Sequence, residues 1–532
     1  QGKAHSIERR AEIAEAFRKE VVPGNSLAMF YVDERNPMLV DSDGQSRARV
    51  LVGISRIRDV GRIRKWDQPV EGGQRQLVFG IPFEHGWPED GVLLPVQRLL
   101  SAVPDAQTRD RYVVALDNGL RRDFRYGSAQ VSTDRMVQAL EGAIASLRAI
   151  QSDGVLPDDF SRDLGWLESQ LQRIWVERGP YPGLGAVVEA LGGKVGGSLQ
   201  RAWVPARIEE GRDPWTVLVE ALEDEGDEDA SLAEYSDALE DVREEWEYQS
   251  DEEKVLAELC ARMSLEPLQV RHVLVADHRA RHGLPSPAEI VANPYLLSEK
   301  YLPKSGEDAI AFATVDHGLL PHESMPRPPI TKVRPNDPRR LRTLLLAALD
   351  RAEKQGHTFM LRGDAVRWVR DQTEGDRQCD VPEGWLEHPK VRAVIDEVLA
   401  QFEEDGRHWI SRRTTSAAEK AILGGVLELL AREPIPSSAV DWQDCEDKSA
   451  AERARDALAL SDAQTAALQQ CFGSPLSLLT GAAGTGKSSL LAPLLRAVRD
   501  REGEVRVLAL APTGKAAARL RELQVQAKTI HR

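Results

Sequence analysis

Glycine, lysine and serine occur together near the carboxyl end in a spacing that suits phosphate chemistry. Residues 481–488 read GAAGTGKS and match the pattern G-x-x-x-x-G-K-[ST]. Glycines at 481 and 486 let the backbone wrap tightly around a β-phosphate, because a β-carbon there would hinder its approach. Lys487 would reach the β- and γ-oxygens, and the Ser488 hydroxyl would complete a magnesium shell. The stretch therefore predicts ATP and Mg²⁺ as ligands, with Lys487 and Ser488 as the catalytic residues. The predicted nucleotide-binding residues of this stretch are Gly481, Ala482, Ala483, Gly484, Thr485, Gly486, Lys487, Ser488 and Ser489.

The segments on either side of this loop have the patterns that its chemistry requires. LSLLT before it predicts a buried strand, and SSLLAPLLRAVRD after it predicts a helix. That helix would begin near Lys487 and aim its positive end at the phosphates. EVRVLALAP then predicts a second strand, so the loop lies in a strand–loop–helix–strand unit.

Two further segments extend the candidate site. Gln464 lies 17 residues before the loop, on a predicted helix that Ser461 would cap. After the second strand comes APTGKAAARL, and a loop there would face the same crevice as the phosphate loop. In that loop Thr513 and the Gly514 N–H would hold a backbone phosphate, and Lys515 adds positive charge.

In this order the segments resemble the RecD-like branch of superfamily 1 DNA helicases, the family of the exonuclease V alpha subunit. The resemblance implies that Gln464 reads adenine and that APTGKAA and the final TIHR are motifs on the DNA side. It implies an ATP-hydrolysing helicase or translocase that moves 5′ to 3′ along single-stranded DNA, in DNA repair, recombination or defence against foreign DNA. The residues that it implies for DNA binding are Pro512, Thr513, Gly514, Lys515 and His531.

The resemblance extends upstream to about Glu252. PAEIVANPYLLSEKY followed by IAFATVDHGLL is similar to the helix-hairpin-helix region that precedes the motor in stand-alone members of this family. NDPRRLRTLLLAALDRAEKQGHTFM resembles the next helix, and RHWISRRTTSAAEKAILGGVLELL the segment that leads into the motor. Ser264 and Ser286 are candidate helix caps, and Asn336 or Asp337 would cap the helix that begins at Pro338.

The amino-terminal half is organised differently. Up to about Leu100 the runs SLAMFYVDE, ARVLVGISRIRDVGRIRKW and RQLVFGIPF predict strands, and from Met136 the pattern turns helical. We therefore expect a multidomain protein of class α+β and α/β. Its predicted parts are a β-rich domain (1–130), a helical region with an acidic tract (131–250), a helix-hairpin-helix-like region (251–325), a winged-helix-like and helical region (326–440) and the start of a RecA-like P-loop lobe (441–532).

Several parts that a helicase needs have no candidate residues. An acidic pair for magnesium, an arginine finger and a second RecA-like lobe cannot be placed before Arg532. We therefore expect the chain to be the amino-terminal portion of a longer enzyme, ending inside the first motor lobe. We also expect that this chain alone does not turn over ATP.

Composition and net charge limit which other functions and locations the chain could have. The chain has 532 residues with a net charge of −16, so only a local basic face could contact nucleic acid. It has no membrane-length apolar run and no signal-peptide core, and its four cysteines are widely spaced, which suits a reducing cytoplasm. The acidic tract between 209 and 254 is interpreted as a solvated helix face or a flexible connection.

Two arginine-rich segments are candidate DNA contacts. The first contains Arg56, Arg58, Arg62, Arg64 and Lys65, with Trp66 close enough to stack a base or simply to pack. The second contains Arg334, Arg339, Arg340 and Arg342. A solvated strand face remains the alternative for the first. The histidines His317, His357 and His408 stand alone in the sequence and predict no catalytic role.

Two other functions remain open beside the motor. A P-loop ATPase switch would use ATP binding to control an assembly without unwinding DNA. A binding scaffold would use residues 1–440 to hold DNA or partner proteins, with the amino-terminal half as the partner contact.

Overall fold

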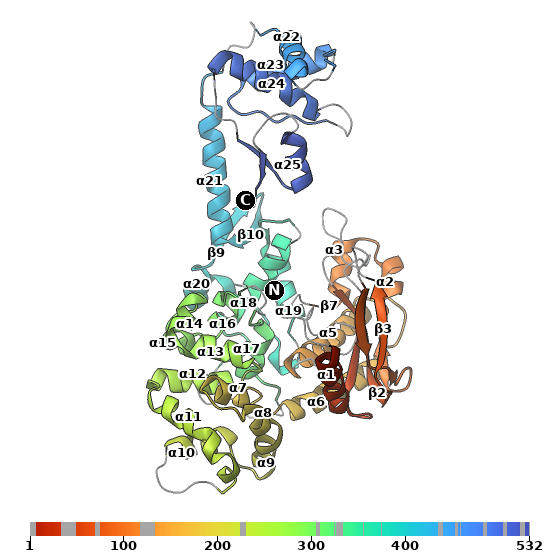
Figure 1. Cartoon of the computed structure of the whole chain (residues 1–532), viewed down its shortest axis with the longest axis vertical. Helices are drawn as coiled ribbons and strands as arrows, with labels where there is room; N and C mark the ends of the chain where they lie inside the picture. The colour runs from red at the N-terminus through yellow and green to blue at the C-terminus, as the bar shows by residue number, and fades with distance from the viewer. Residues whose placement is uncertain are drawn as a thin grey trace. The chain divides into compact units, whose positions relative to one another are not determined.

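The protein is described here by a computed structural model of the chain. The described residues are 7–32, 49–69, 75–116, 133–223, 230–304, 309–323, 325, 333–354, 356–373, 375–382, 384–434, 440–452, 456–457, 459–481, 487–503, 508–521 and 527–530. They form two compact units, Gln1–Arg413 and Thr414–Arg532. Figure 1 shows the elements of both units.

The amino-terminal part of the first unit is built around one long strand, β2 (Arg49–Val60). Its antiparallel partners are β1 (Leu27–Val32), β5 (Phe83–His85), β6 (Gly91–Leu93) and β7 (Ala115–Leu116). A separate antiparallel pair consists of β3 (Arg64–Pro69) and β4 (Arg75–Gly80). The short helices here are α1 (Ile7–Glu20), α2 (Val96–Ala102), α3 (Ala106–Arg109) and η1 (Asp110–Tyr112). The three runs that predict strands thus contain β1, β2 with β3, and β4.

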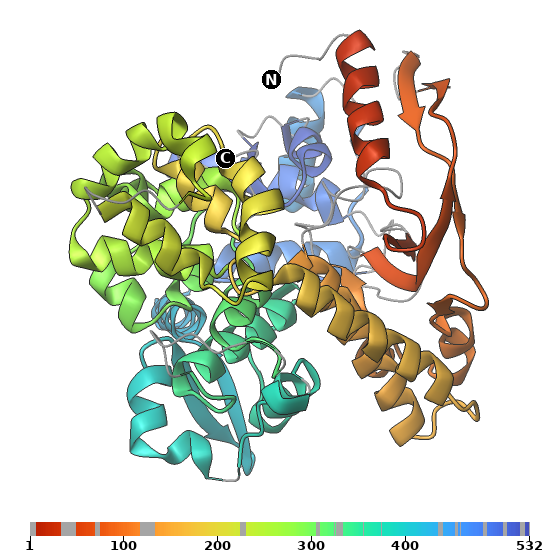
Figure 2. The same cartoon turned by 90° about the horizontal axis from the view of Figure 1, so that it is seen from below.

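Two long helices, α5 (Thr133–Ser152) and α6 (Ser161–Arg178), cover the sheet and lie beside its strands in both views (Figures 1 and 2). Their apolar faces join the core of the sheet, where Leu51 and Ile54 of β2 pack with Leu140 and Trp175. This core includes residues on both sides of position 130, because a sheet with one apolar face needs a layer of helices to cover it.

A second core belongs to a helical region. Its elements are α7 (Leu184–Ala190), α8 (Gly196–Ser198), η2 (Leu199–Trp203), α9 (Val204–Glu209), α10 (Pro214–Glu223), η3 (Ala233–Tyr235), α11 (Ser236–Glu247), α12 (Asp251–Ala261), α13 (Pro267–Leu274), α14 (Ala276–Arg281), α15 (Pro287–Ala292), α16 (Leu296–Lys300) and α17 (Phe312–Leu319). In the acidic tract, α11 buries Leu239, Val242 and Trp246, while its acidic residues are exposed. This part of the tract is therefore a solvated helix face.

A third core lies between helices and a small sheet. Its elements in chain order are α18 (Pro338–Lys354), β8 (Met360–Leu361), α19 (Arg362–Asp371), η4 (Gly375–Arg377), η5 (Trp385–Glu387), α20 (Pro389–Ile395), β9 (Leu399–Glu404) and β10 (Arg407–Arg412). The strand order is β8-β10-β9, and both pairs are antiparallel. Asp405 and Gly406 connect β9 to β10 with φ of 52° and 69°, the backbone that a tight two-residue hairpin turn requires.

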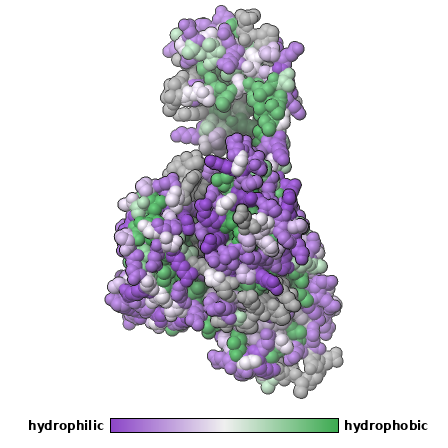
Figure 3. Space-filling view, turned by 180° about the vertical axis from the view of Figure 1, so that it is seen from behind, coloured by the Kyte–Doolittle hydropathy of each residue, from purple (hydrophilic) through white to green (hydrophobic). Residues whose placement is uncertain are grey.

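The second unit contains the candidate site. Its elements are α21 (Arg413–Leu430), α22 (Trp442–Glu452), α23 (Asp462–Gly473), α24 (Lys487–Glu502), β11 (Ala509–Ala511), α25 (Gly514–Arg521) and β12 (Ala527–Thr529). α22, α23 and α24 share a core that includes Trp442, Phe472 and Leu490. Much apolar surface is left exposed on this unit, as the upper part of Figure 3 shows, and Leu478 is 88% exposed.

Two local predictions are wrong. LSLLT, residues 476–480, is not a strand, because its backbone finds no ladder partner among the described residues and a strand takes its hydrogen bonds from neighbours. Ser264 does not cap α13. That helix begins at Pro267 with Glu266 as its N-cap, since a proline is favoured in the first turn. Ser286 does cap α15, in a capping box with Glu289, and Asp337 accepts from the Arg339 N–H at the start of α18.

Candidate nucleotide and nucleic-acid site

The phosphate loop is described only at its two ends. Gly481 is exposed, and Lys487 is the first residue of α24. Ala482, Ala483, Gly484, Thr485 and Gly486 lie outside the described residues, as do the side chains of Ser488 and Ser489. The predicted roles of these residues therefore stay predictions.

The ends of the loop are in direct contact. The Lys487 Nζ donates a hydrogen bond to the Gly481 carbonyl, so the ammonium lies at the entrance of the loop. The first N–H groups of a helix have no acceptor within the helix, and α24 is 16 residues long. A lysine beside a helix amino terminus is a suitable set of donors for a phosphate.

The position of this helix start follows from the packing of α24. Leu490 and Ala497 of α24 pack against Trp442 and Cys445 of α22 and against Phe472 of α23. Pro493 lies inside the helix, where it lacks the N–H group that would donate to the preceding turn. Burial of one face of α24 thus anchors the helix while Lys487 remains only partly buried.

Gln464 has a structural contact that its sequence position already suggested. Ser461 is the N-cap of α23, as predicted, and its hydroxyl accepts from the Gln464 N–H at 3.3 Å. In return the Gln464 Oε1 accepts from the Ser461 N–H at 2.9 Å. The two residues form a capping box, which holds the Gln464 amide at the start of the helix.

The loop after β11 is exposed and ends in a helix cap. Pro512, Thr513, Gly514 and Lys515 are all exposed. The Thr513 hydroxyl accepts from the Ala516 N–H at 3.2 Å, so Thr513 caps α25. The exposed turn therefore presents the amino terminus of α25 and the Lys515 side chain to solvent.

The two predicted DNA-side segments lie at one edge of a small parallel sheet. β11 and β12 pair in parallel with Ala511 opposite Thr529, and the Ile530 N–H donates to the Ala511 carbonyl at 3.0 Å. α25 connects the two strands and packs Ala517 on Ala511 and Ala527. The chain thus reaches the same edge after β11 and after β12. His531 itself lies outside the described residues.

Most of the second arginine-rich segment is not available to DNA, although Arg334 is exposed. Arg340 is fully buried and pairs with Asp316, while Arg342 is buried and pairs with Glu299 and Glu397. Arg339 pairs with Asp337. Arg340 and Arg342 stabilise the fold, because their carboxylate partners are distant in sequence and invisible to a local pattern.

The first arginine-rich segment divides into two parts. Arg56 pairs with Asp90, and Arg58 pairs with Glu89, so both are used within the domain. Arg62, Arg64 and Lys65 are exposed, and the Trp66 side chain lies outside the described residues. A DNA contact therefore stays a prediction only for Arg62, Arg64 and Lys65.

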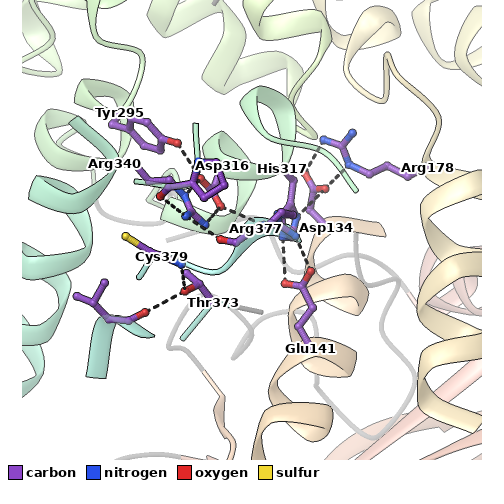
Figure 4. A network of polar contacts seen from close by, with 12 residues as sticks. Asp134, Glu141, Arg178, Tyr295, Asp316, His317, Arg340, Thr373, Arg377 and Cys379 are labelled. Carbon is purple, nitrogen blue, oxygen red and sulfur yellow. Dashed lines mark hydrogen bonds and ion pairs between the residues drawn. The ribbon is translucent and has the colours of Figure 1, made fainter. Parts of the chain in front are cut away.

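His317 is packed in the interior, as the absence of a catalytic pattern around it allows, but it has charged partners that the sequence does not show. His317 is fully buried and lies between two carboxylates, Asp134 and Glu141, in a network that Figure 4 shows. His357 and His408 are exposed. No sequence signal could have found the network, because its bonded partners are up to 236 residues apart, the separation between Glu141 and Arg377.

Two kinds of feature are absent from the residues described. They contain no group of three or more side chains of the metal-binding kinds that could hold an ion. Among them there is also no helix with the length and apolar character needed to cross a membrane.

Comparison with known proteins supports the chemistry of the carboxyl-terminal part. Residues 459–532 match a family model described as an AAA domain. The ATP-dependent RecD2 DNA helicase of Deinococcus radiodurans is 32% identical over 206 residues, which are 37% of this chain and 27% of that protein. The match thus spans about a quarter of the length of this relative. No solved structure matches the chain. The two matches support a RecD-like helicase family with a P-loop ATPase domain near the carboxyl end.

Proposed function

We propose that this protein acts as an ATP-dependent helicase or translocase on single-stranded DNA and moves in the 5′ to 3′ direction. The observation that carries the proposal is the contact between Lys487 and Gly481, which puts an ammonium group where the phosphate loop meets the amino terminus of α24. The similarity to the RecD2 helicase supports the choice of DNA over other substrates of P-loop proteins.

The residues around the loop suit a magnesium nucleotide. Lys487 would exchange its bond to the Gly481 carbonyl for one to the β- and γ-oxygens, and Ser488 would take a place in the magnesium shell. Gln464 would contact adenine from the start of α23. The bound nucleotide would supply the phosphoanhydride whose hydrolysis drives movement. The chain would contribute fixed positive charge that does not need to reorganise during the reaction.

The edge of the β11–β12 sheet would hold the DNA backbone. Thr513 and the first N–H groups of α25 are suited to a phosphate, and Lys515 adds a mobile charge beside them. Pro512 and His531 complete the proposed strand-binding set. Because these contacts reach the backbone and not the bases, we expect little sequence preference.

The remaining parts would handle DNA or partners. We propose a helix-hairpin-helix-like role for 251–325 and a winged-helix-like role for 326–440, and the order α18, β8, α19, α20, β9, β10 supports the second. The amino-terminal half would contact partner proteins. The resemblance that indicates the motor suggests work in repair, recombination or defence, in the cytoplasm.

Substitution of the loop lysine tests the proposal. Lys487→Ala should weaken ATP binding by about 10- to 100-fold, because a charged hydrogen bond contributes about 1.5–3 kcal/mol. Isothermal calorimetry with Mg·ATP measures this directly. Lys448→Ala is the matched control, since Lys448 lies in the same unit and pairs with Asp444 on an exposed surface. Equal affinities of the two variants would refute nucleotide binding at this loop.

A second experiment distinguishes a helicase from a P-loop ATPase switch that does not unwind DNA. A fluorescent duplex with a 5′ single-stranded tail is incubated with the full-length enzyme, ATP and Mg²⁺, and strand displacement is followed. Displacement that is lost in Lys487→Ala supports the helicase. ATP binding without displacement on either tail polarity would instead favour the P-loop switch.

A further inference from the structure

A buried ionic network joins the helices that cover the amino-terminal sheet to the rest of the first unit (Figure 4). Its charged members come from α5, α6, α17, α18 and η4, five separate elements. They are Asp134, Glu141, Arg178, Asp316, His317, Arg340 and Arg377. Arg340 belongs to an arginine-rich segment with a predicted DNA contact, but its burial rules that contact out. The other members have no predicted role in ATP or DNA binding, so the network calls for a separate explanation.

His317 bridges two carboxylates of α5. Its Nδ1 lies 3.1 Å from an oxygen of Asp134, and its Nε2 lies 3.5 Å from an oxygen of Glu141. Only the imidazolium can donate from both nitrogens at once, because the neutral ring has one donor and one acceptor. The geometry around His317 is therefore satisfied by the protonated form.

The groups that surround His317 have opposite effects on its pKa. Burial and the Arg377 guanidinium lower the pKa of His317, but the hydrogen bonds to Asp134 and Glu141 outweigh them, so the pKa is raised. On the third side is the Trp175 ring, with its centroid 5.1 Å from that of the imidazole. Asp316 is the neighbour of His317 on α17, and its charge is matched by Arg340 and Arg377.

The two carboxylates are not equally dependent on the histidine. Asp134 also accepts from Arg178 and from the Ser264 N–H, and its side chain is 1% exposed. Glu141 is 25% exposed and has Arg377 as its other partner. When His317 loses its proton, the remaining N–H should stay on the buried Asp134. Glu141 then faces a ring nitrogen that is also an acceptor, and this contact opens.

Other contacts cross the same junction: the Arg178 guanidinium of α6 donates to the Arg262 carbonyl, and Arg351 of α18 pairs with Asp110 of η1. Arg111 of η1 pairs with Asp371 of α19 at 3.3 Å, but their side chains are 37% and 31% exposed. Ion pairs exposed to this degree contribute little, because solvent screens their charges. The buried network is therefore the part of the junction whose charge state can change its strength.

We propose that this network is a proton-dependent latch. With His317 protonated, the amino-terminal domain is fixed on α17 through Asp134 and Glu141, and loss of the proton releases the Glu141 side of the contact. A histidine that is more basic in the closed than in the open state stabilises the closed state at low pH and loses that effect as pH rises through its closed-state pKa. The latch is thus closed in mildly acidic solution and opens toward alkaline pH.

Hydrogen exchange of the first unit measures this opening. In the window between the open-state and closed-state pKa of the imidazole, the opening equilibrium rises by up to tenfold per pH unit. Protection of amides in α5 and α17 should fall accordingly as the pH rises above the ordinary pKa of an imidazole, relative to α10, which lies outside the junction. His317→Gln should remove this pH dependence. His408→Gln, on the exposed face of β10, should leave it unchanged.

A milder variant keeps the test decisive if His317→Gln does not fold. Glu141→Gln removes one carboxylate at the edge of the network and should lower the titration midpoint of His317, followed by NMR of its ring protons, while that of His408 stays constant. The latch is wrong if His317 titrates at the same pH as His408. It is equally wrong if α17 exchange has the same pH dependence in His317→Gln as in the unmodified protein. Neither readout uses ATP or DNA, so the outcome is independent of the proposed function.

Discussion

At the scale of single residues, Gln464 has two roles that one substitution cannot tell apart: it belongs to the capping box at the start of α23, and it is proposed to contact adenine. Its amide bonds to Ser461 in the structure, while the family resemblance assigns it to adenine. An effect of Gln464→Ala on activity would therefore not by itself prove base recognition. Its capping partner offers the matched control.

We predict that Ser461→Ala and Gln464→Ala both destabilise the second unit, by about 1 kcal/mol for the lost serine cap and less for the glutamine. Only Gln464→Ala should weaken ATP binding, by severalfold, because only Gln464 would contact the base. Urea unfolding and calorimetry with Mg·ATP measure the two effects separately. An equal loss of affinity in both variants would assign the whole effect to the helix start.

At the scale of elements, two glycines show how backbone conformation and not residue type decides the effect of a substitution. Gly406 closes the β9–β10 turn with φ +69°, where a side chain is strained even though no atom lies within 4 Å. Gly165 lies in the interior of α6, exposed, also with no atom within 4 Å of an added Cβ. The space around both is open, so sterics do not distinguish them.

The predicted effects of the two substitutions have opposite signs. Gly406→Ala should destabilise the first unit by about 1–2 kcal/mol, because an L-residue pays for the left-handed conformation. Gly165→Ala should stabilise it by about 0.5–1 kcal/mol, because alanine loses less entropy in a helix. The measurement is the midpoint of chemical unfolding of each variant. A stabilising Gly406→Ala would show that the turn adopts another conformation in solution.

At the scale of the whole molecule, the first unit contains three hydrophobic cores, and ion pairs join the elements of one core to those of another. Arg340 of α18 is buried with Asp316 of α17 and also donates to the Arg377 carbonyl of η4. Burial raises the pKa of Asp316, but the ion pairs with Arg340 and Arg377 outweigh it and hold the pKa well below its usual range. The carboxylate is therefore charged and depends on its partners.

Arg340→Met should destabilise the first unit by about 3–5 kcal/mol, because it leaves a buried carboxylate short of one partner. Arg148→Met is the control, since the Arg148–Glu168 pair is about half exposed on both sides and should cost about 0–1 kcal/mol. Urea unfolding followed by tryptophan fluorescence compares the two. The Tyr295 hydroxyl also donates to Asp316, at 2.7 Å. Similar costs would mean that Arg377 and Tyr295 satisfy Asp316 without Arg340.

Local patterns determined much of the fold and of the candidate site. The strands β1 and β2, the helices α5, α6 and α24, and the caps Ser286 and Ser461 follow from periodicity and capping, which act over a few residues. The exposed turn after β11 likewise follows from spacing, while the phosphate loop stays a prediction because residues 482–486 lie outside the described residues. The predicted chemistry of both depends on backbone N–H groups and a lysine that are close in the chain.

Only the tertiary structure decided which charged residues are available for function. Arg340, Arg342 and His317 resemble surface or isolated residues in the sequence, yet each is buried against a carboxylate far along the chain. LSLLT has the composition of a buried strand but forms none, because a strand exists only with a neighbour. Burial and ladder pairing are properties of contacts between distant segments, whereas the sequence alone determines conformational preferences and the spacing of reactive groups.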